Sequence, residues 1–333
     1  MKHLLLAAVA ASLVFPAHAQ EPAPIPSPGE IAASAPASDW IAIAPSDLLV
    51  MDLAPDAKGT PRRVVIQLMP APFSQGWIGN IRKLAAAHWW DGTSVNRVQD
   101  NYVAQWGDAT EKKALPEGLA TVAERDYEVG DPAAVMKIVQ KMHENRTRMT
   151  VLLKAQDRSV LPRISAPEMR TKVDPYSDFQ YFAGGWPIAG STGVWPVHCY
   201  GAVGVGRNLS PDTGSGAELY TVIGHAPRHL DRNIAVVGRV ISGIENLSSL
   251  PRGTGALGFY EKEEERVPIQ SIRLASELAA AEQPKFEYLS TESDSFARYA
   301  DARANRRDPF FIKPAGGADI CNIPVPVRPA PTK

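Results

Sequence analysis

Residues 95–108 decide the fold of this chain, and they read Val95-Asn96-Arg97-Val98-Gln99-Asp100-Asn101-Tyr102-Val103-Ala104-Gln105-Trp106-Gly107-Asp108. Alternating residues in the first half and an apolar run in the second predict two short strands around a turn. Arg97 is unusual inside such a strand, because arginine is almost never fully buried without a partner. Together with Tyr102, Val103 and Gln105 it predicts an apolar surface that carries two polar side chains, a composition that suits a ligand groove. An edge strand with a solvated arginine is the alternative.

The composition is that of an ordinary globular protein. The chain has 333 residues, of which 44% are hydrophobic and 21% charged, enough for one large or two small domains. Its formal net charge of −1 gives no electrostatic reason to expect nucleic acid or an acidic membrane surface as a partner.

The first residues predict export. Met1 to His3 give a short positive start, residues 4–16 are apolar, and Ala17-His18-Ala19 has the small-x-small pattern of a cleavage site. A membrane anchor, the alternative, needs about 20 apolar residues, and no segment of the chain is that long. We expect a signal peptide over 1–19, cleaved after Ala19, and a mature periplasmic protein, although secretion beyond the periplasm is compatible with the same signal.

The two cysteines, Cys199 and Cys321, allow two states. In an oxidising compartment they form one disulfide that ties the C-terminal tail to the main domain, or they remain two free buried thiols. Their spacing matches no metal or redox motif.

The N-terminal part predicts strand pairs around one helix. Residues 20–46 are rich in Pro and Ala and predict a linker. Strands are expected at 47–53 and 63–69, paired as an antiparallel hairpin. An apolar stripe at helical spacing from Phe73 to His88 predicts a helix before the strand pair of 95–108. Adjacent strand pairs favour an antiparallel sheet or barrel with a helix over an opening.

Residues 109–195 interrupt this rhythm. A short helix is expected after Asp131, which caps it, with Pro132 at its first position. Met149 to Leu153 predict a strand. Residues 174–196 are rich in aromatic residues and glycine, which favours either an ordered loop packed on the domain or a binding surface for a partner.

Strand patterns then resume and end before a distinct tail. Residues 242–250 predict a short helix with Ser242 as its cap and Glu245 at the capping-box position. Over 279–333 we expect a docked helix followed by a loose Pro-rich end. Further strands are expected at 201–207, 218–223, 234–240 and 267–274. The tail helix is predicted by the spacing of Phe296, Tyr299, Ala300 and Arg303.

Conventional catalytic sets do not occur in the sequence. His225 and His229 are four residues apart, but Pro227 between them argues against a helical metal pair. His198 and Cys199 are adjacent, and adjacent strand residues point to opposite faces, so they cannot act as a thiol and its base. There is no Gly-x-Ser-x-Gly elbow, phosphate loop or paired-carboxylate motif.

Three blocks of the chain resemble the cyclophilins. Residues 95–108 are similar, without a gap, to the family's Phe-His-Arg-Val-Ile-x-x-Phe-Met-x-Gln-Gly-Gly-Asp. Residues 205–207 and 216–220 resemble Met-Ala-Arg and Ser-x-Gln-Phe-Phe. Residues 229–240 resemble Trp-Leu-Asp-x-x-His-x-Val-Phe-Gly-x-Val. The resemblance covers about 47–278, within which 109–195 is far longer than the family usually has.

The resemblance implies a mainly β fold. This fold is a closed antiparallel eight-stranded β-barrel capped by helices. The barrel domain would span 47–278 and contain 109–195 as an extended insertion, and 279–333 would add a C-terminal helix and a Pro-rich tail.

The resemblance also implies peptidyl-prolyl cis–trans isomerisation, with proline-containing polypeptides as partners. The peptide bond resists rotation with a barrier of about 18–20 kcal/mol because of resonance. A guanidinium aimed at the prolyl nitrogen stabilises the twisted state more than the planar one. By resemblance Arg97 is this donor, and no nucleophile, metal or cofactor is required. The implied substrate-binding residues are Tyr102, Val103, Gln105, Glu218, Tyr220, Leu230 and His229. A monomer that assists the folding of exported proteins is expected.

Several pocket positions differ from the family. Val103 replaces Met, Glu218 replaces Gln, and His229 stands where many members have Trp. Ile234 replaces a pocket His, and two tyrosines replace phenylalanines. Glu218 is expected either to pair with Arg97 and hold it away from the substrate, or to orient it. We therefore expect weaker or altered activity, and the alternative function is a catalytically weak cyclophilin-like scaffold that binds Pro-containing segments or a protein partner.

Overall fold

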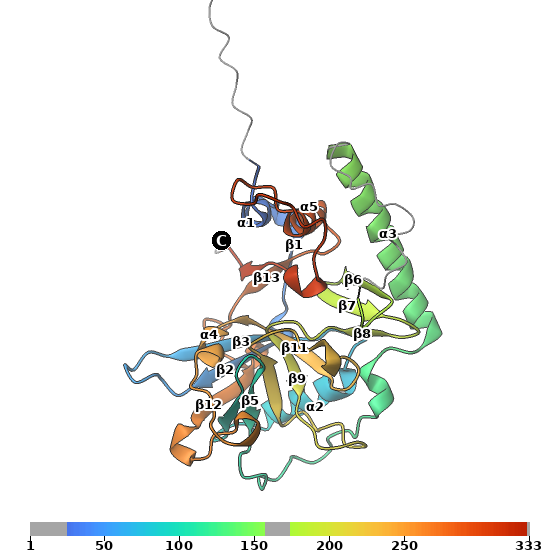
Figure 1. The fold of residues 1–333 in the computed structure, drawn as a ribbon. Helices are drawn as coiled ribbons and strands as arrows, with labels where there is room; N and C mark the ends of the chain where they lie inside the picture. Colours follow the sequence, from blue (N-terminus) through green and yellow to red (C-terminus); the bar gives the residue numbers. More distant parts are fainter. Residues whose placement is uncertain (1–24, 157–173, 332–333) are drawn as a thin grey trace, which may run out of the picture.

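A closed β-barrel forms the larger part of the structure (Figure 1). The computed structural model describes residues 25–156 and 174–331, so the predicted signal peptide lies outside the described residues. Eight strands, all paired antiparallel, follow one another in the order β10-β5-β4-β12-β2-β3-β11-β9. They are β2 (Leu48–Leu53), β3 (Arg62–Leu68), β4 (Ser94–Val98), β5 (Val103–Gly107), β9 (Ala202–Val205), β10 (Leu219–Val222), β11 (Val236–Ser242) and β12 (Val267–Leu274). The predicted mainly β, eight-stranded barrel is confirmed.

Strand β2 is buried on both faces, which explains its nearly continuous apolar sequence. Leu49 and Met51 belong to the main core of the barrel. Leu48 and Val50 belong to a second cluster, into which Phe286 of the C-terminal segment packs. Successive strand residues face opposite sides of a sheet, so the C-terminal segment covers the outer face that would otherwise meet water.

Helix α2 (Gln75–Ala86) covers one opening of the barrel, as predicted. Trp77, Ile81 and Leu84 are fully buried and lie on one side of the helix at a spacing of three to four residues. The indole Nε1 of Trp77 donates to the backbone carbonyl oxygens of Thr213 and Gly214, both at 3.1 Å. The helix is thereby joined to the loop that precedes β10.

The insertion contains more regular structure than the sequence predicted. Helix α3 (Pro132–Gln156) starts as expected, with the Asp131 carboxylate accepting from the Ala134 N–H at 2.8 Å. The predicted strand at 149–153 is wrong: these residues continue α3, and no glycine or proline occurs between Pro132 and Gln156 to interrupt it.

The aromatic stretch 174–196 is a three-stranded antiparallel sheet rather than a loop. Its strands are β6 (Phe179–Ala183), β7 (Trp186–Gly190) and β8 (Val194–Pro196). Gly184 and Gly185 form the turn of the first hairpin, with φ of 57° and 85°. Two consecutive residues at positive φ make a two-residue hairpin turn, which glycine adopts without steric cost.

The two ends of the described chain form a second module above the barrel (Figure 1). Strand β1 (Trp40–Ala42) pairs with β13 (Phe286–Leu289), which also pairs with β14 (Val327–Pro329). Helices α1 (Pro28–Ala33) and α5 (Asp294–Ala304) pack together on this sheet through Ala32, Leu289 and Phe296.

This module corrects two predictions and confirms one. Residues 20–46 do not form a plain linker, since they contain α1 and β1, and the Pro-rich tail is not a loose end, since β14 pairs with β13. Strand β1 gains its order from a partner more than 200 residues away and β14 from one about 40 residues away, which composition cannot reveal. The tail helix is confirmed as α5.

Helix α4 (Glu245–Ser248) is shorter than predicted and starts differently. Its N-cap is Ile244 rather than Ser242, and no side chain caps it. Ser242 instead ends β11, where it lies opposite Val65 of β3. Ser242 is therefore paired in the β-ladder of the barrel and is not the helix cap that the capping-box pattern predicted.

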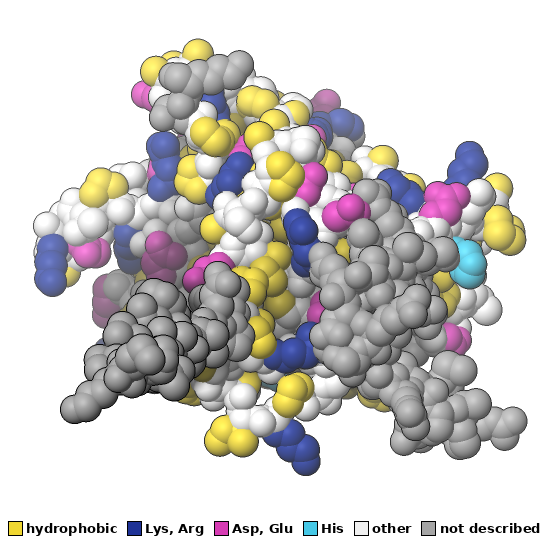
Figure 2. Space-filling model, turned by 90° about the horizontal axis from the view of Figure 1, so that it is seen from above, with side chains coloured by type: hydrophobic (Ala, Val, Ile, Leu, Met, Phe, Trp, Pro, Cys, Tyr) yellow, Lys and Arg dark blue, Asp and Glu magenta, His cyan; other side chains and the backbone are white. Residues whose placement is uncertain are grey.

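The surface shows mixed charge in the described residues. On the described part of the face drawn in Figure 2, basic and acidic side chains lie among one another, in keeping with the net charge of −1. No helix in residues 25–156 or 174–331 is both long and apolar enough to cross a membrane.

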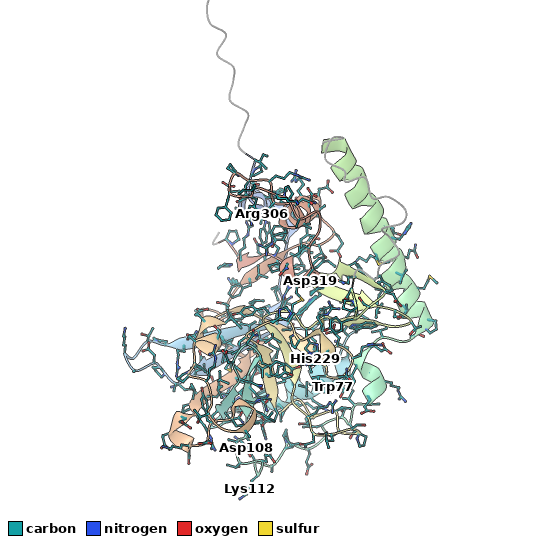
Figure 3. The ribbon with its side chains drawn as sticks, viewed as in Figure 1. Trp77, Asp108, Lys112, His229, Arg306 and Asp319 are labelled. Carbon is teal, nitrogen blue, oxygen red and sulfur yellow. A yellow bond between two sulfur atoms is a disulfide. The ribbon has the colours of Figure 1, made fainter. Side chains whose placement is uncertain are left out.

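A disulfide joins Cys199 to Cys321. It links the segment between β8 and β9 to the short helix Ile320–Asn322, which Asp319 caps by accepting from the Cys321 N–H at 2.8 Å. Figure 3 places Asp319 between the barrel and the module of the chain ends, and Arg306 within that module. Of the two states allowed by the sequence, the structure has the bonded one.

Removing this disulfide is expected to destabilise the protein. The bond closes a loop of 122 residues, and cross-links over loops of this length stabilise by about 2–5 kcal/mol. Urea unfolding of the double variant Cys199→Ala/Cys321→Ala should show that loss relative to wild type. Dithiothreitol should lower the stability of wild type by a similar amount and leave the double variant unchanged. Equal unfolding free energies for wild type and variant would contradict the prediction.

Candidate active site

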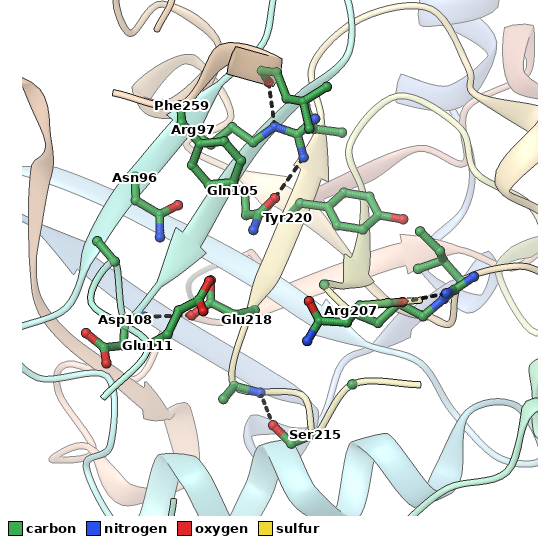
Figure 4. A pocket seen from close by; sticks show the side chains of 18 of the residues that line it. Asn96, Arg97, Gln105, Asp108, Glu111, Arg207, Ser215, Glu218, Tyr220 and Phe259 are labelled. Atoms are coloured by element: carbon green, nitrogen blue, oxygen red, sulfur yellow. Dashed lines mark hydrogen bonds between the residues drawn. The ribbon is translucent and has the colours of Figure 1, made fainter. Parts of the chain in front are cut away.

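Three neighbouring barrel strands bring the predicted polar residues into one row. Gln105 on β5 lies opposite Arg97 on β4 and opposite Tyr220 on β10. Residues directly opposite in a ladder share one face of the sheet. This row borders a pocket of about 750 Å³ (Figure 4).

The guanidinium of Arg97 is held by uncharged groups. Its Nη1 donates to Oε1 of Gln105 at 3.0 Å, its Nε donates to the carbonyl oxygen of Leu257 at 2.7 Å, and its Nη2 donates to Gln99. Its Cζ lies 5.8 Å from the ring centre of Tyr102 and 5.4 Å from that of Phe259. Burial lowers the pKa of Arg97, but an arginine stays charged in proteins.

The loop between α4 and β12 supplies part of this environment. Leu257 has a φ of 56°, and its carbonyl accepts from Arg97, as described above. The next residue, Gly258, lies so close to β4 that an added Cβ would come within 2.8 Å of the Cα of Gln99. The Tyr260 N–H donates to the carbonyl of Asn96 at 3.0 Å. The loop therefore pairs with β4 like an extra strand.

The apolar wall faces Arg97 from β5, β10 and the turn before β11. Val103 and Tyr220 are buried, and Tyr102 and Leu230 are half-buried. All four line the pocket. The predicted residue His229 does not line the pocket: it is exposed, and its ring stacks on that of Tyr102, with ring centres 6.4 Å apart and an interplanar angle of 14°.

The hydroxyl of Tyr220 starts a buried chain of polar side chains. It lies 3.0 Å from Nε2 of His198, whose Nδ1 lies 2.9 Å from Asp231. Asp231 accepts from Nε of Arg228 at 2.6 Å, and Arg228 donates to Asp174 at 2.9 Å. Each of the five is at most 6% exposed. Burial raises the pKa of Tyr220 well above its ordinary value, so its hydroxyl stays protonated.

This buried chain of polar side chains connects the pocket to segments that the sequence analysis did not assign to it. Asp174 belongs to the insertion, and Arg228 and Asp231 flank the turn that carries Leu230. In the sequence, His198 is notable only as the neighbour of Cys199. No local pattern could have identified the chain, because its members come from four separate segments.

Glu218 lies on the polar side of the pocket and does not pair with Arg97. Its Oε1 accepts from the N–H of Asp108 at 2.6 Å. Burial raises the pKa of Glu218 to about 7, although the Asp108 N–H and the amides of Gln105 and Asn96 oppose this as hydrogen-bond donors. The carboxylate is so close to Gly107 that a Cβ there would lie 1.9 Å from Oε1. The expected alternative in which Glu218 holds Arg97 through an ion pair is therefore wrong.

Sequence reasoning missed the residues that the α4–β12 loop contributes. Leu257 and Phe259 contact Arg97, and Tyr260 completes the rim. The adjacent aromatic residues in a Gly-rich loop were the available signal. Among the described residues, no group of three or more His, Cys, Asp or Glu side chains is placed to hold a metal ion.

Known proteins share features of this sequence and this fold. The sequence matches the family described as cyclophilin type peptidyl-prolyl cis-trans isomerase/CLD over residues 62–274. The fold is similar to that of the cyclophilin AquaCyp293 from Hirschia baltica, with a TM-score of 0.57, 21% identity, and coverage of 88% of this chain and 95% of that one.

A more distant match is a cyclophilin type peptidyl-prolyl cis-trans isomerase of Cryptosporidium parvum, crystallised in the presence of the dipeptide Ala-Pro. It has 10% identity and a TM-score of 0.35, and the alignment covers 68% of this chain and 98% of that one. A similarity this low supports no inference. No curated protein sequence matches the chain.

Substitution of Tyr220 tests the buried chain. Tyr220→Phe keeps the ring but leaves Nε2 of His198 without its partner, and an unsatisfied buried polar group costs about 1–3 kcal/mol. Urea unfolding should show that loss of stability. The matched control is Tyr102→Phe at a half-buried position, for which a change of about 0.5 kcal/mol or less is expected. Equal effects of the two substitutions would contradict the role given to the Tyr220 hydroxyl.

Proposed function

The chain belongs to the cyclophilin-type peptidyl-prolyl cis–trans isomerases, and from this membership in a family of isomerases we propose that Arg97 promotes rotation of X-Pro bonds in exported proteins. One observation carries the proposal: Arg97 and Gln105 lie beside an apolar wall that includes Tyr220, in a pocket of about 750 Å³, which has room for a proline ring. Proline-containing polypeptides are the substrates, and the folding of exported proteins is the process assisted.

The proposed mechanism needs only a positioned charge. Rotation about the X-Pro bond becomes easier when the nitrogen lone pair leaves conjugation with the carbonyl. A guanidinium N–H directed at that nitrogen stabilises the twisted state more than the planar state. Tyr102, Val103 and Leu230 hold the proline ring while the preceding carbonyl rotates. No covalent intermediate and no proton transfer are required.

The environment of Arg97 suits this role. All three acceptors that hold it are neutral, so its charge is not cancelled by a carboxylate in those contacts. Its hydrogen bonds to the α4–β12 loop and to β5 orient the guanidinium before the substrate arrives. A preorganised charge in a partly desolvated site is worth more than the same charge in water.

Two features support export to an oxidising compartment. The predicted signal peptide over 1–19 is one, and the disulfide between Cys199 and Cys321 is the other. Disulfides persist in secreted and periplasmic proteins and are rare where thiols are kept reduced. We propose the periplasm as the location of the protein, and these two features support that proposal.

A weakly catalytic scaffold is the second candidate function, and two pocket residues favour it. Val103 fills the floor less than the family's methionine would, and Ile234 supplies no hydrogen bond to the substrate. Such a protein would bind Pro-containing segments and release them with little isomerisation.

An isomerisation assay separates the two functions. Exchange spectroscopy on a blocked Ala-Pro tetrapeptide should show clear acceleration by wild type. Arg97→Ala should lower kcat/KM by about 10²–10³-fold, the usual cost of removing a donor that stabilises a transition state. Arg97→Lys should recover only part of this loss, because an ammonium cannot keep the forked geometry.

The matched control is Arg63→Ala. Arg63 pairs with Asp52 on the barrel and does not line the pocket, so this variant should keep the wild-type rate. A wild-type rate equal to the uncatalysed background would favour the scaffold. Equal rates for wild type and Arg97→Ala would exclude Arg97 as the catalytic group.

A further inference from the structure

Glu218 lies at the polar edge of the pocket, on the same face of the barrel as Gln105 (Figure 4). Its carboxylate accepts from the backbone N–H of Asp108 at 2.6 Å, and the side-chain amides of Gln105 and Asn96 act on it as donors that lower its pKa. It stands directly before β10, two residues from Tyr220. It is the one residue of this donor and acceptor set that can change its charge near neutral pH.

The side-chain amide of Gln105 has an oxygen that accepts hydrogen bonds and an NH₂ group that donates them, and each faces a different partner. Its carbonyl Oε1 accepts from Arg97, so its NH₂ group is the end left to act on Glu218, whose pKa the Gln105 side chain lowers as a donor. An ionised carboxylate is an acceptor only, and therefore admits only this orientation of the amide. A protonated Glu218 can donate, and so it also admits the flipped orientation, in which the NH₂ group faces Arg97. Since arginine accepts no hydrogen bond, the flipped amide cannot hold the guanidinium.

We propose that Glu218 is a positioning residue, an inference that rests on the proposed function. The ionised carboxylate of Glu218 orients Gln105, and Gln105 orients Arg97. Isomerisation is faster in this ionised state. The substitution of Gln by Glu at this position then adds a pH response to the site. The neutral amide of the usual residue has no such response.

Other charged groups face the same pocket from every neighbouring element. Asp108 directly follows β5, and Glu111 and Lys113 come next. Arg207 and Asp212 lie between β9 and β10, and Tyr260 and Arg266 precede β12. Burial raises the pKa of Glu218 to about 7, and the Asp108 carboxylate adds to this effect. The carboxyl is thus protonated below neutral pH and ionised above it, so the rate should rise with pH.

The test measures kcat and KM of the full-length mature protein between pH 5.5 and 8.5. The substrate is a blocked Ala-Pro tetrapeptide without titratable groups, followed by exchange spectroscopy so that no coupling protease is needed. For wild type, kcat should rise up to about tenfold between pH 6 and pH 8, following one ionisation, because the ionised fraction of a group with this pKa changes by about that factor. KM should stay constant, because Arg97 acts on the transition state.

Three variants test whether Glu218 causes the pH dependence of kcat. Glu218→Gln should be active with a flat pH profile, and Gln105→Ala should be slower and also flat, because the connection to Arg97 is gone. His229→Gln, which removes the exposed imidazole beside Tyr102, should keep the wild-type profile whatever its absolute rate. Near-UV circular dichroism verifies the fold of each variant.

The outcomes separate this inference from the proposed function. A flat wild-type profile, an unchanged profile in Glu218→Gln, or a response lost only in His229→Gln would overturn the role of Glu218. A response that persists in Gln105→Ala would overturn the connection through the amide. No acceleration by wild type at any pH would remove the proposed function and this inference together.

Discussion

A charged guanidinium held only by neutral oxygens is the constraint on which the site depends. Arg97 is half-buried, and desolvation makes its charge costly unless its N–H groups are satisfied. Carboxylate partners would satisfy them and also cancel the charge. The amides and the backbone carbonyl around Arg97 satisfy them while leaving the charge available. Gln105 and the Leu257 carbonyl are thus as necessary to the site as the arginine.

The surrounding polar groups form two systems that meet at the pocket. Glu218, Gln105 and Arg97 define its polar side, and the buried chain from Tyr220 to Asp174 lies behind its apolar side. The buried chain ties the insertion to the turn that carries Leu230, since Asp174 and Asp231 both accept from Arg228. The substitution of a phenylalanine by Tyr220 makes sense only beside His198, which gives its hydroxyl a partner.

The sequence was sufficient for the barrel and for most of the pocket. Strands β2, β3, β4, β5 and β12 follow from residue alternation and short apolar runs, which are local properties of a chain. The amphipathic stripe of α2 is equally local. Arg97, Gln105 and Tyr220 share a face because the register of β4, β5 and β10 sets Gln105 directly opposite the other two. His229 was assigned to the pocket by alignment, and its exposed position beside Tyr102 could not be read from its neighbours.

What the sequence determined by itself is therefore the set of local elements: the barrel strands, the covering helix, the tail helix and the arginine in its strand. Only the tertiary structure decided the pairing of β1 with β13, the disulfide between Cys199 and Cys321, the chain behind Tyr220, and the partners of Glu218. The physical reason is separation along the chain. Backbone periodicity depends on residues a few positions apart, whereas these contacts join residues about 20 to more than 200 positions apart, whose proximity is set by the closure of the barrel and the packing of the chain ends upon it.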